Sequence, residues 1–446
     1  MDRNPKQVKP KELLSVTDGV LLTAGMIIGA LIFKAPSTVA GATGGAGQFL
    51  FAWLLGGLVS LCGALVYAEL ASRHPDTGGE YMFLMRGWGR AVAFLFAWSR
   101  LTVIQTGAIA AVAFVFGDYA SEILRLGAHS SAIWAAIAVA ALTALNVAGT
   151  LQTKLLQKVM EISLITGLVV FSIAALVKGG APAESAAPGA GFGAFGFAMI
   201  FVLLAYGGWN EAAYLAGEVK DGRRNMTRIL VIGVLAVTAL YLLVNLAYLA
   251  VLGHGGIKAS KAVAADVMRA IAGDKGAVVL ALIVCVSVLT TINAAIFTGA
   301  RTNYALGRDF HFLRALGQWR ESGSTPANAL LLQGVITLIL VGASALTPDG
   351  FNAMVAYTSP VFWTFFLLTG LTLFVFRFRN ETAGSFKVPL YPIVPVAFVL
   401  TCAYMLYSSI NYVRNPEYGP KFGIAVLAGL AVMAAGVPLY FFAKKK

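Results

Sequence analysis

The stretches GMIIGALIFKAP, from Gly25 to Pro36, and LLAYGGWNEAAYLAGE, from Leu203 to Glu218, decide the fold of this chain. Each lies inside a long apolar segment and carries glycines in its middle. Glycine permits a helix to unwind, which frees backbone N–H and C=O groups. Inside a bilayer, freed groups are tolerated only where they meet a ligand or line a cavity. The two stretches therefore predict a pair of broken membrane helices.

Close helix packing is the alternative explanation for the first stretch, because Gly25 and Gly29 form a small-xxx-small pattern. The positions of the breaks favour binding instead. They fall in the first and sixth apolar segments, as expected for two five-helix repeats of inverted topology with a site between them. Half-helix N-termini there offer N–H donors to an anion, and freed carbonyls accept from an ammonium group. An amino acid, which carries both charges, suits such a site.

The composition of the chain is that of a membrane protein. Of its 446 residues, 59% are hydrophobic and 12% charged, and the mean hydropathy is +0.79; soluble domains are about 45–50% apolar and about 25% charged. We expect an all-α, polytopic protein with twelve transmembrane helices, because a lipid-exposed backbone must satisfy its own hydrogen bonds. The expected spans are residues 15–40, 48–72, 90–117, 130–149, 155–178, 193–216, 228–252, 277–304, 328–346, 351–377, 393–413 and 421–443.

Basic residues predict the orientation of the chain. If the N-terminal tail (1–14), alternate connections and the C-terminus are cytoplasmic, 23 of the 33 Lys and Arg residues lie on that side and nine on the other. An excess of Lys and Arg marks cytoplasmic segments. Both termini are therefore predicted to be cytoplasmic, and the net charge of +13 reflects topology, not nucleic-acid binding. The polar first residues do not resemble a signal peptide.

The cysteines and histidines give no sign of a disulfide framework, a metal site or catalysis. Cys62, Cys285 and Cys402 all lie within apolar segments, and the four histidines lie far apart at segment ends or in connections. A metal centre or an enzyme needs several such groups to converge. We therefore expect no cofactor, no metal and no enzymatic activity.

Several motifs resemble a known family. GMIIGALIF resembles the first-helix signature GxxIGxGIF of the amino acid–polyamine–organocation (APC) superfamily, and AYGGWN (205–210) is similar to the sixth-helix signature of its L-type amino acid transporter branch. Further matches are GEVKDGRRNMTRIL (217–230), INAAIFTGARTNYALGRD (292–309) and FRFRNETAGSFKVPLYPIVP (376–395). The resemblance implies a 5+5 inverted repeat of the LeuT type. The first repeat would occupy residues 15–178, the second 193–377, and two accessory helices 393–443.

The resemblance also implies a substrate-binding site, residue by residue. Backbone N–H groups of Gly29, Ala30 and Leu31 would hold the substrate carboxylate, and carbonyls of Ile27, Leu204 and Gly207 would meet its ammonium group. The positions that line or gate the pocket correspond to Tyr206, Trp209, Asn210, Gln105 and Asn293. For Gln105 and Asn293, an ordinary interhelical hydrogen bond is an equal alternative. Arg100, nearer the cytoplasmic end of its span, is expected to close an inner gate by pairing.

Three further positions bear on the substrate and on coupling. Leu31 stands where the family has glycine, and its bulk favours a small substrate. Glu211 follows the second break and would recognise a cationic group or relay a proton, with a pair to a neighbouring span as the equal alternative. Lys158 matches a family lysine whose ammonium replaces sodium, although the alignment also allows Lys154. A fixed ammonium implies exchange, and one that loses its proton implies proton symport.

The sequence thus predicts a sodium-independent secondary transporter of small or medium neutral L-amino acids, by exchange or proton symport, in a cell membrane. The expected source is bacterial. The alternatives are an amine, polyamine or acidic amino acid transporter and, outside this class, a receptor or channel. The expected partners are the amino acid and the lipid bilayer. Some animal relatives attach to a glycoprotein through a cysteine between helices 3 and 4, and residues 118–129 contain none, so no disulfide-linked subunit is expected.

Overall fold

The computed structural model describes residues 15–74, 79–149, 154–181, 191–212, 222–310, 313–320, 325–379, 386–414 and 419–443. This part of the chain is helical, with one isolated backbone bridge between Arg320 and Thr325. The first half holds α1 (Val16–Ile27), the 3-10 turn η1 (Ala30–Phe33), α2 (Ala35–Gly41), α3 (Ala46–Arg73), α4 (Gly79–Trp88), α5 (Arg90–Ser99), the π-helical η2 (Arg100–Ile104), α6 (Gln105–Ile123), α7 (Ser130–Ala148) and α8 (Lys154–Lys178). The second half holds α9 (Phe192–Ala205), α10 (Trp209–Ala212), α11 (Gly222–Ala259), α12 (Val263–Asp309), α13 (Ala327–Ser344), α14 (Gly350–Phe378), α15 (Ile393–Asn411), η6 (Tyr412–Arg414) and α16 (Gly419–Ala443).

Nine helices among the described residues are long and apolar enough to cross a membrane, and the chain is a multi-pass membrane protein. Helix is present in each of the twelve expected segments. Three of these segments do not hold one long apolar helix. Segments 15–40 and 193–216 are each broken into shorter helices, as the glycines predicted, and in 155–178 the apolar helix runs over Ile162–Lys178.

The connections are more helical than the sequence predicted. The short helix α4 precedes the third expected span. Helix α11 continues past the predicted end at residue 252, and α12 begins before the predicted start at residue 277. Gly253 (φ 67°) and Gly273 (φ 72°) interrupt these two long helices. The turns after Gly253 are too short to show an apolar period. Before Gly273, Val263, Val267 and Ile271 do recur at helical spacing, and the sequence analysis did not use this signal.

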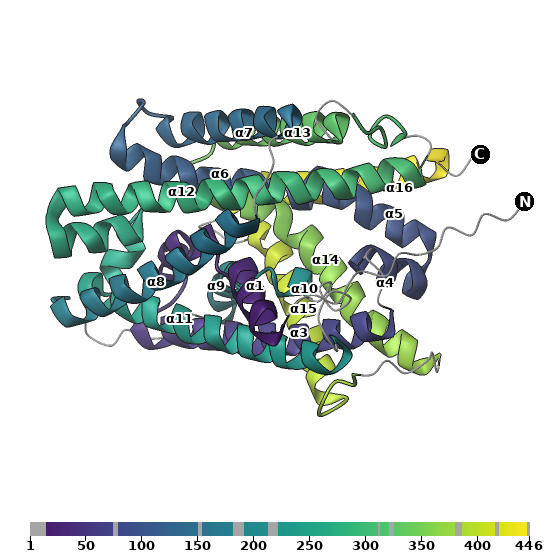
Figure 1. Ribbon diagram of the computed structural model, residues 1–446, viewed down its shortest axis with the longest axis horizontal. Coiled ribbons are helices and arrows are strands. Elements are labelled where there is room, and N and C mark those ends of the chain that lie inside the picture. The colour runs from purple at the N-terminus through teal and green to yellow at the C-terminus, as the bar shows by residue number, and fades with distance from the viewer. Residues whose placement is uncertain are drawn as a thin grey trace, which may run out of the picture.

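The broken helices lie in the middle of the helix bundle. In Figure 1, α1, α9 and α10 occupy the centre, with α3 and α11 along one side and α6 and α12 along the other. α1 packs against α10 and α11, while η1 packs against α6 and α12. Buried aromatic rings fill the space next to the breaks: the ring centroids of Tyr206 and Tyr241 lie 5.0 Å apart, and Trp53 lies 5.7 Å from Tyr241. The fold thus places both breaks away from the lipid.

Candidate functional site

The first break lies between α1 and α2. Helix α1 ends at Ile27, Gly29 is extended (φ −119°, ψ −170°), and the chain then forms the 3-10 turn η1 before α2 begins. Pro36 stands in the first turn of α2, where its missing N–H leaves no helical hydrogen bond unmade. Backbone groups around Gly29 are therefore outside regular helix, as the sequence predicted for this stretch.

The second break joins α9 to α10 and touches the first. Residues 206–208 form a turn in which the Gly207 N–H donates to the Leu204 carbonyl at 3.0 Å and the Gly208 N–H to Oδ1 of Asn210 at 3.3 Å. Gly208 has φ +109°, and a Cβ on it would lie 2.2 Å from the carbonyl oxygen of Met26. Only glycine fits here, because both the backbone angle and the contact exclude a side chain. The two broken helices are thus in direct backbone contact.

Three buried tyrosines satisfy carbonyls that the breaks leave free. Tyr241 on α11 donates its hydroxyl to the carbonyls of Ile27 and Ala205, each at 3.0 Å, and so bridges both breaks. Tyr248, one heptad later on α11, donates to Ile32, and Tyr119 on α6 donates to Phe33. The sequence analysis missed all three. A signal was available, since a tyrosine buried in an apolar span needs a hydrogen-bond partner for its hydroxyl.

The expected substrate-binding backbone groups lie at these breaks. Ala30 is buried, and Leu31 is partly buried and packs against the core. Two of the three carbonyls expected to meet an ammonium group, those of Ile27 and Leu204, accept hydrogen bonds from within the protein here. An ammonium group at this site would therefore have to share or replace those internal donors.

Tyr206 and Trp209 are buried side chains next to the second break. The Tyr206 hydroxyl donates to the Trp53 carbonyl at 3.0 Å on α3. Trp209 packs its ring against those of Tyr67 and Phe366. A small apolar cavity lies at this place, lined in part by Ser60, Gly207, Trp209 and Trp363.

Gln105 and Asn293 both make interhelical hydrogen bonds. Nε2 of Gln105 donates to the Ala295 carbonyl on α12 at 3.0 Å, and Oδ1 of Asn293 accepts from Asn146 on α7 at 2.6 Å. Their helices, α6 and α12, flank η1. Lys158 lies on α8 and Glu211 on α10, but the side chains of both are outside the described residues.

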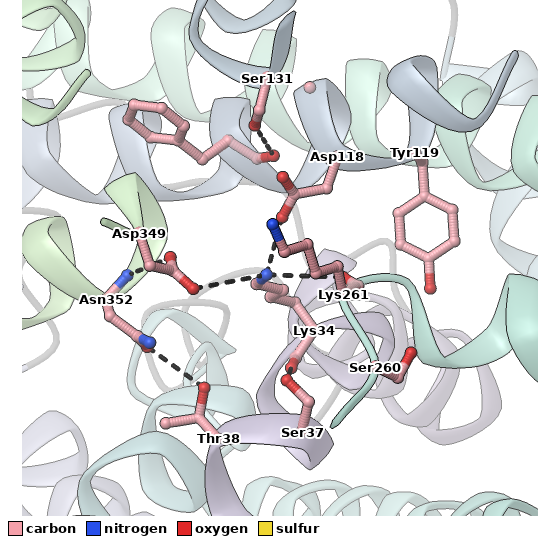
Figure 2. A network of polar contacts seen from close by, with 12 residues as sticks. Lys34, Ser37, Thr38, Asp118, Tyr119, Ser131, Ser260, Lys261, Asp349 and Asn352 are labelled. Carbon is pink, nitrogen blue, oxygen red and sulfur yellow. Dashed lines mark hydrogen bonds and ion pairs between the residues drawn. The ribbon is translucent and has the colours of Figure 1, made fainter. Parts of the chain in front are cut away.

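A buried lysine joins three elements beside the first break, and Figure 2 shows this network. Nζ of Lys34 lies 2.8 Å from Oδ2 of Asp118 on α6 and 3.7 Å from Oδ2 of Asp349, which caps the N-terminus of α14. Thr38 on α2 also donates to Oδ1 of Asn352 at 3.2 Å. These contacts hold the segment after the first break against α6 and α14. The sequence analysis gave Lys34 no role.

A second charged network lies beside the second break. Nδ2 of Asn210 donates to Oε1 of Glu80 at 3.3 Å, and the Tyr67 hydroxyl donates to the same oxygen at 2.8 Å. Arg100 pairs with Oε2 of Glu80 at 3.7 Å, so the expected pairing of this arginine is present. Glu80 itself, on α4, was not singled out from the sequence. This carboxylate ties α10 to α3, α4 and η2.

A third network clamps α3 to α14 at the end of α3. Glu69 is fully buried and accepts from Arg73, from Arg377 on α14 and from the backbone N–H of Val388 at 2.7 Å. A buried carboxylate is tolerated only when it is paired and hydrogen-bonded in this way. Breaking this clamp would leave Glu69 as an uncompensated buried charge.

Comparison with known proteins finds amino acid transporters among the relatives of this chain. The chain is 30% identical over 431 residues to b(0,+)-type amino acid transporter 1 of Homo sapiens, covering 93% of this chain and 86% of that one. It is 27% identical over 441 residues to a serine/threonine exchanger of Bacillus subtilis (98% of each chain) and 26% identical over 447 residues to the cystine/glutamate transporter of Homo sapiens (98% and 86%). The amino acid permease family model matches residues 14–434. The chain therefore belongs to the amino acid permease family.

Proposed function

We propose that this protein transports small or medium neutral L-amino acids without sodium, and that both charged ends of the substrate bind backbone groups at the two breaks. The observation that carries the proposal is the direct contact of the breaks at Gly208 and Met26. N–H groups of Gly29, Ala30 and Leu31 would receive the carboxylate, and carbonyls of Ile27, Leu204 and Gly207 the ammonium group. The bulk of Leu31 beside this site favours small substrates.

The proposed architecture has twelve spans, with an inverted repeat of residues 15–178 and 193–377 and two accessory helices in 393–443. Both termini would be cytoplasmic, in the cell membrane of a bacterium. Support comes from the matching positions of the two broken segments and from the distribution of basic residues. A rocking motion of one repeat against the other would expose the central site to each side in turn.

Two charged networks fit the closing contacts that alternating access requires. On the proposed outer side, Lys34 holds the first break to Asp118 and Asp349, and on the inner side Glu80 holds Asn210 and Arg100. Both networks are formed in this structure. Opening to one side would break one network while the other stays closed, so that substrate passes without a continuous pore.

Lys158 is the proposed coupling residue, and Gln105, Asn293, Tyr206, Trp209, Asn210 and Glu211 the proposed lining or gating positions. A lysine with a permanent charge would support exchange, whereas one that releases its proton during the cycle would support proton symport. The relation to a serine/threonine exchanger supports exchange.

Counterflow in proteoliposomes tests the proposal. Vesicles loaded with unlabelled alanine should take up labelled alanine without sodium. The variant Gly207→Val should lose most of this uptake, while Gly342→Val, where an added Cβ meets nothing within 4 Å, should keep it. Uptake that needs internal substrate indicates exchange, and uptake into empty vesicles under a proton gradient indicates symport. No uptake of any neutral amino acid, with uptake of the decarboxylated amine, would overturn the substrate assignment.

A further inference from the structure

An exposed group of arginines lies at the end of α12, away from the proposed transport site. We propose that Arg301, Arg308 and Arg314, the arginine patch, bind the phosphate of an anionic phospholipid at the membrane surface. All three side chains are exposed, and none makes an ion pair with any residue in the described part of the chain. This inference needs only the membrane embedding of α12 and is independent of the transported substrate.

The depth of Arg301 along α12 matches the headgroup region. The same helix exposes Val279, Ile283 and Val286, an apolar face suited to lipid. From Val279 to Arg301 a helix rises about 33 Å at about 1.5 Å per residue. The hydrocarbon core of a bilayer is about 30 Å thick. If Val279 lies at one boundary of the core, Arg301 lies just beyond the other, where lipid phosphates are.

Local packing prepares the Arg301 guanidinium for a phosphate. Its central carbon lies 3.4 Å from the ring centroid of Phe297, one turn earlier on α12. Stacking covers one face of the planar group and leaves its N–H edges free to form two parallel hydrogen bonds to an oxyanion. Arginine matches phosphate better than lysine because of this planar fork.

A tight backbone contact brings the third arginine to the patch. A Cβ on Gly307 would lie 2.3 Å from the backbone N of Gly317 and 2.8 Å from the Leu313 carbonyl, so the segment after α12 folds back onto its last turn. Arg314 follows Leu313, and Arg308 follows Gly307, which places both on this fold-back. Arg301 lies two turns before Arg308 on the same face of α12.

The surroundings of the patch favour a lipid over a protein partner. Trp319 is 41% exposed and packs edge-to-face against Tyr304, with ring centroids 5.3 Å apart. Such aromatic pairs are enriched at the membrane–water boundary. The nearest acidic residue along the chain, Asp309, hydrogen-bonds to Tyr81, whose pKa is raised to about 12 by burial and by this carboxylate. That carboxylate therefore accepts a hydrogen bond from α4, and with its charge counted the three arginines and Asp309 carry a net charge of +2.

Native mass spectrometry of the full-length protein in neutral detergent, mixed with equal amounts of phosphatidylglycerol and phosphatidylcholine, tests the site. Wild-type protein should retain phosphatidylglycerol preferentially. Each arginine removed should weaken retention roughly fivefold, so Arg301→Gln has a measurable effect and the triple variant R301Q/R308Q/R314Q should weaken retention about a hundredfold. Soluble glycerol phosphate should not compete at equal concentration, since it lacks the acyl chains that lie on α12; equal competition would point to a soluble phosphate ligand and overturn the lipid assignment.

The matched control removes the same charge at the other end of the molecule. Arg125, Arg414 and Lys421 are exposed there, and R125Q/R414Q/K421Q should retain the lipid like wild type. The proposal is wrong if the patch variants retain phosphatidylglycerol normally or if the control loses it equally. A shift of wild-type protein, but not of the patch variant, to twice the mass without lipid would instead identify a second copy of the chain as the occupant. Size exclusion and helicity confirm that each variant is folded.

Discussion

At the scale of single residues, the Tyr241 hydroxyl connects the two broken helices, because it donates to a backbone carbonyl of each. Tyr241→Phe removes this donor and leaves two buried carbonyls without it, which costs about 1–3 kcal/mol. We expect a lower melting temperature in detergent and an altered substrate affinity in counterflow. Tyr404→Phe is the control, since Tyr404 on α15 also donates to a backbone carbonyl, that of Phe192 at the end of α9 away from the second break. Equal behaviour of the two variants would contradict this role.

Gly208 gives a second prediction at this scale. Gly208→Ala places a methyl group against the Met26 carbonyl and puts a side chain on a backbone with φ +109°. Strain of this kind costs about 1–3 kcal/mol, and the clash adds to it. We expect loss of counterflow together with a lowered melting temperature, whereas Gly47→Ala, with open space around its Cβ, should change neither. Normal transport by Gly208→Ala would show that the breaks need not touch.

The glycines of both breaks could be recognised from the sequence, but their partners could not. Gly29 and Gly208 stand out as helix-breaking residues inside apolar segments. The sequence signals only that the polar groups of Tyr241 and Lys34 need a partner, and Glu80 carries no local pattern. Which groups these three residues meet depends on carbonyls and charges that tertiary packing brings from other helices. Lys34 did offer one hint, as a lysine inside an apolar segment is expensive and is a functional candidate for that reason.

At the scale of elements, the segment after the first break is held by charge. Lys34→Met leaves Asp118 and Asp349 without their cation, and removing one partner of a buried pair costs about 3–5 kcal/mol. We expect α2 to separate from α6 and α14, so that a cysteine placed at Ser37 in a cysteine-free background reacts faster with an external maleimide. The double variant K34M/D118N should restore part of the slow reaction, since it removes one of the two repelling charges.

Lys178→Met is the control for this experiment, because within the described residues its Nζ donates to a backbone carbonyl on α12 and pairs with no carboxylate. It should leave the reaction rate at Ser37→Cys unchanged. Unchanged reactivity in Lys34→Met would mean that packing, not the ion pairs, closes the outer side. Element boundaries beyond the spans were the weakest sequence prediction. The helical turns around Gly253 and Gly273 and the helix α4 are too short to cross a membrane, and the sequence analysis searched for apolar segments of membrane-spanning length.

At the scale of the whole molecule, apolar length predicts the helices, and the charge of the connections predicts their direction. The placement of 23 Lys and Arg residues on one side and nine on the other implies that the connection before α5 is cytoplasmic and that the connection before α7 is external. Ala91 and Ala128 are exposed positions near these connections. In whole cells, a membrane-impermeant maleimide should therefore label Ala128→Cys at once and Ala91→Cys only after the membrane is opened. The reverse pattern would mean that the chain has the opposite orientation in the membrane. Labelling of both positions in intact cells would mean that no membrane span separates them. This result would contradict the count of five helices per repeat, on which the matching positions of the two breaks depend.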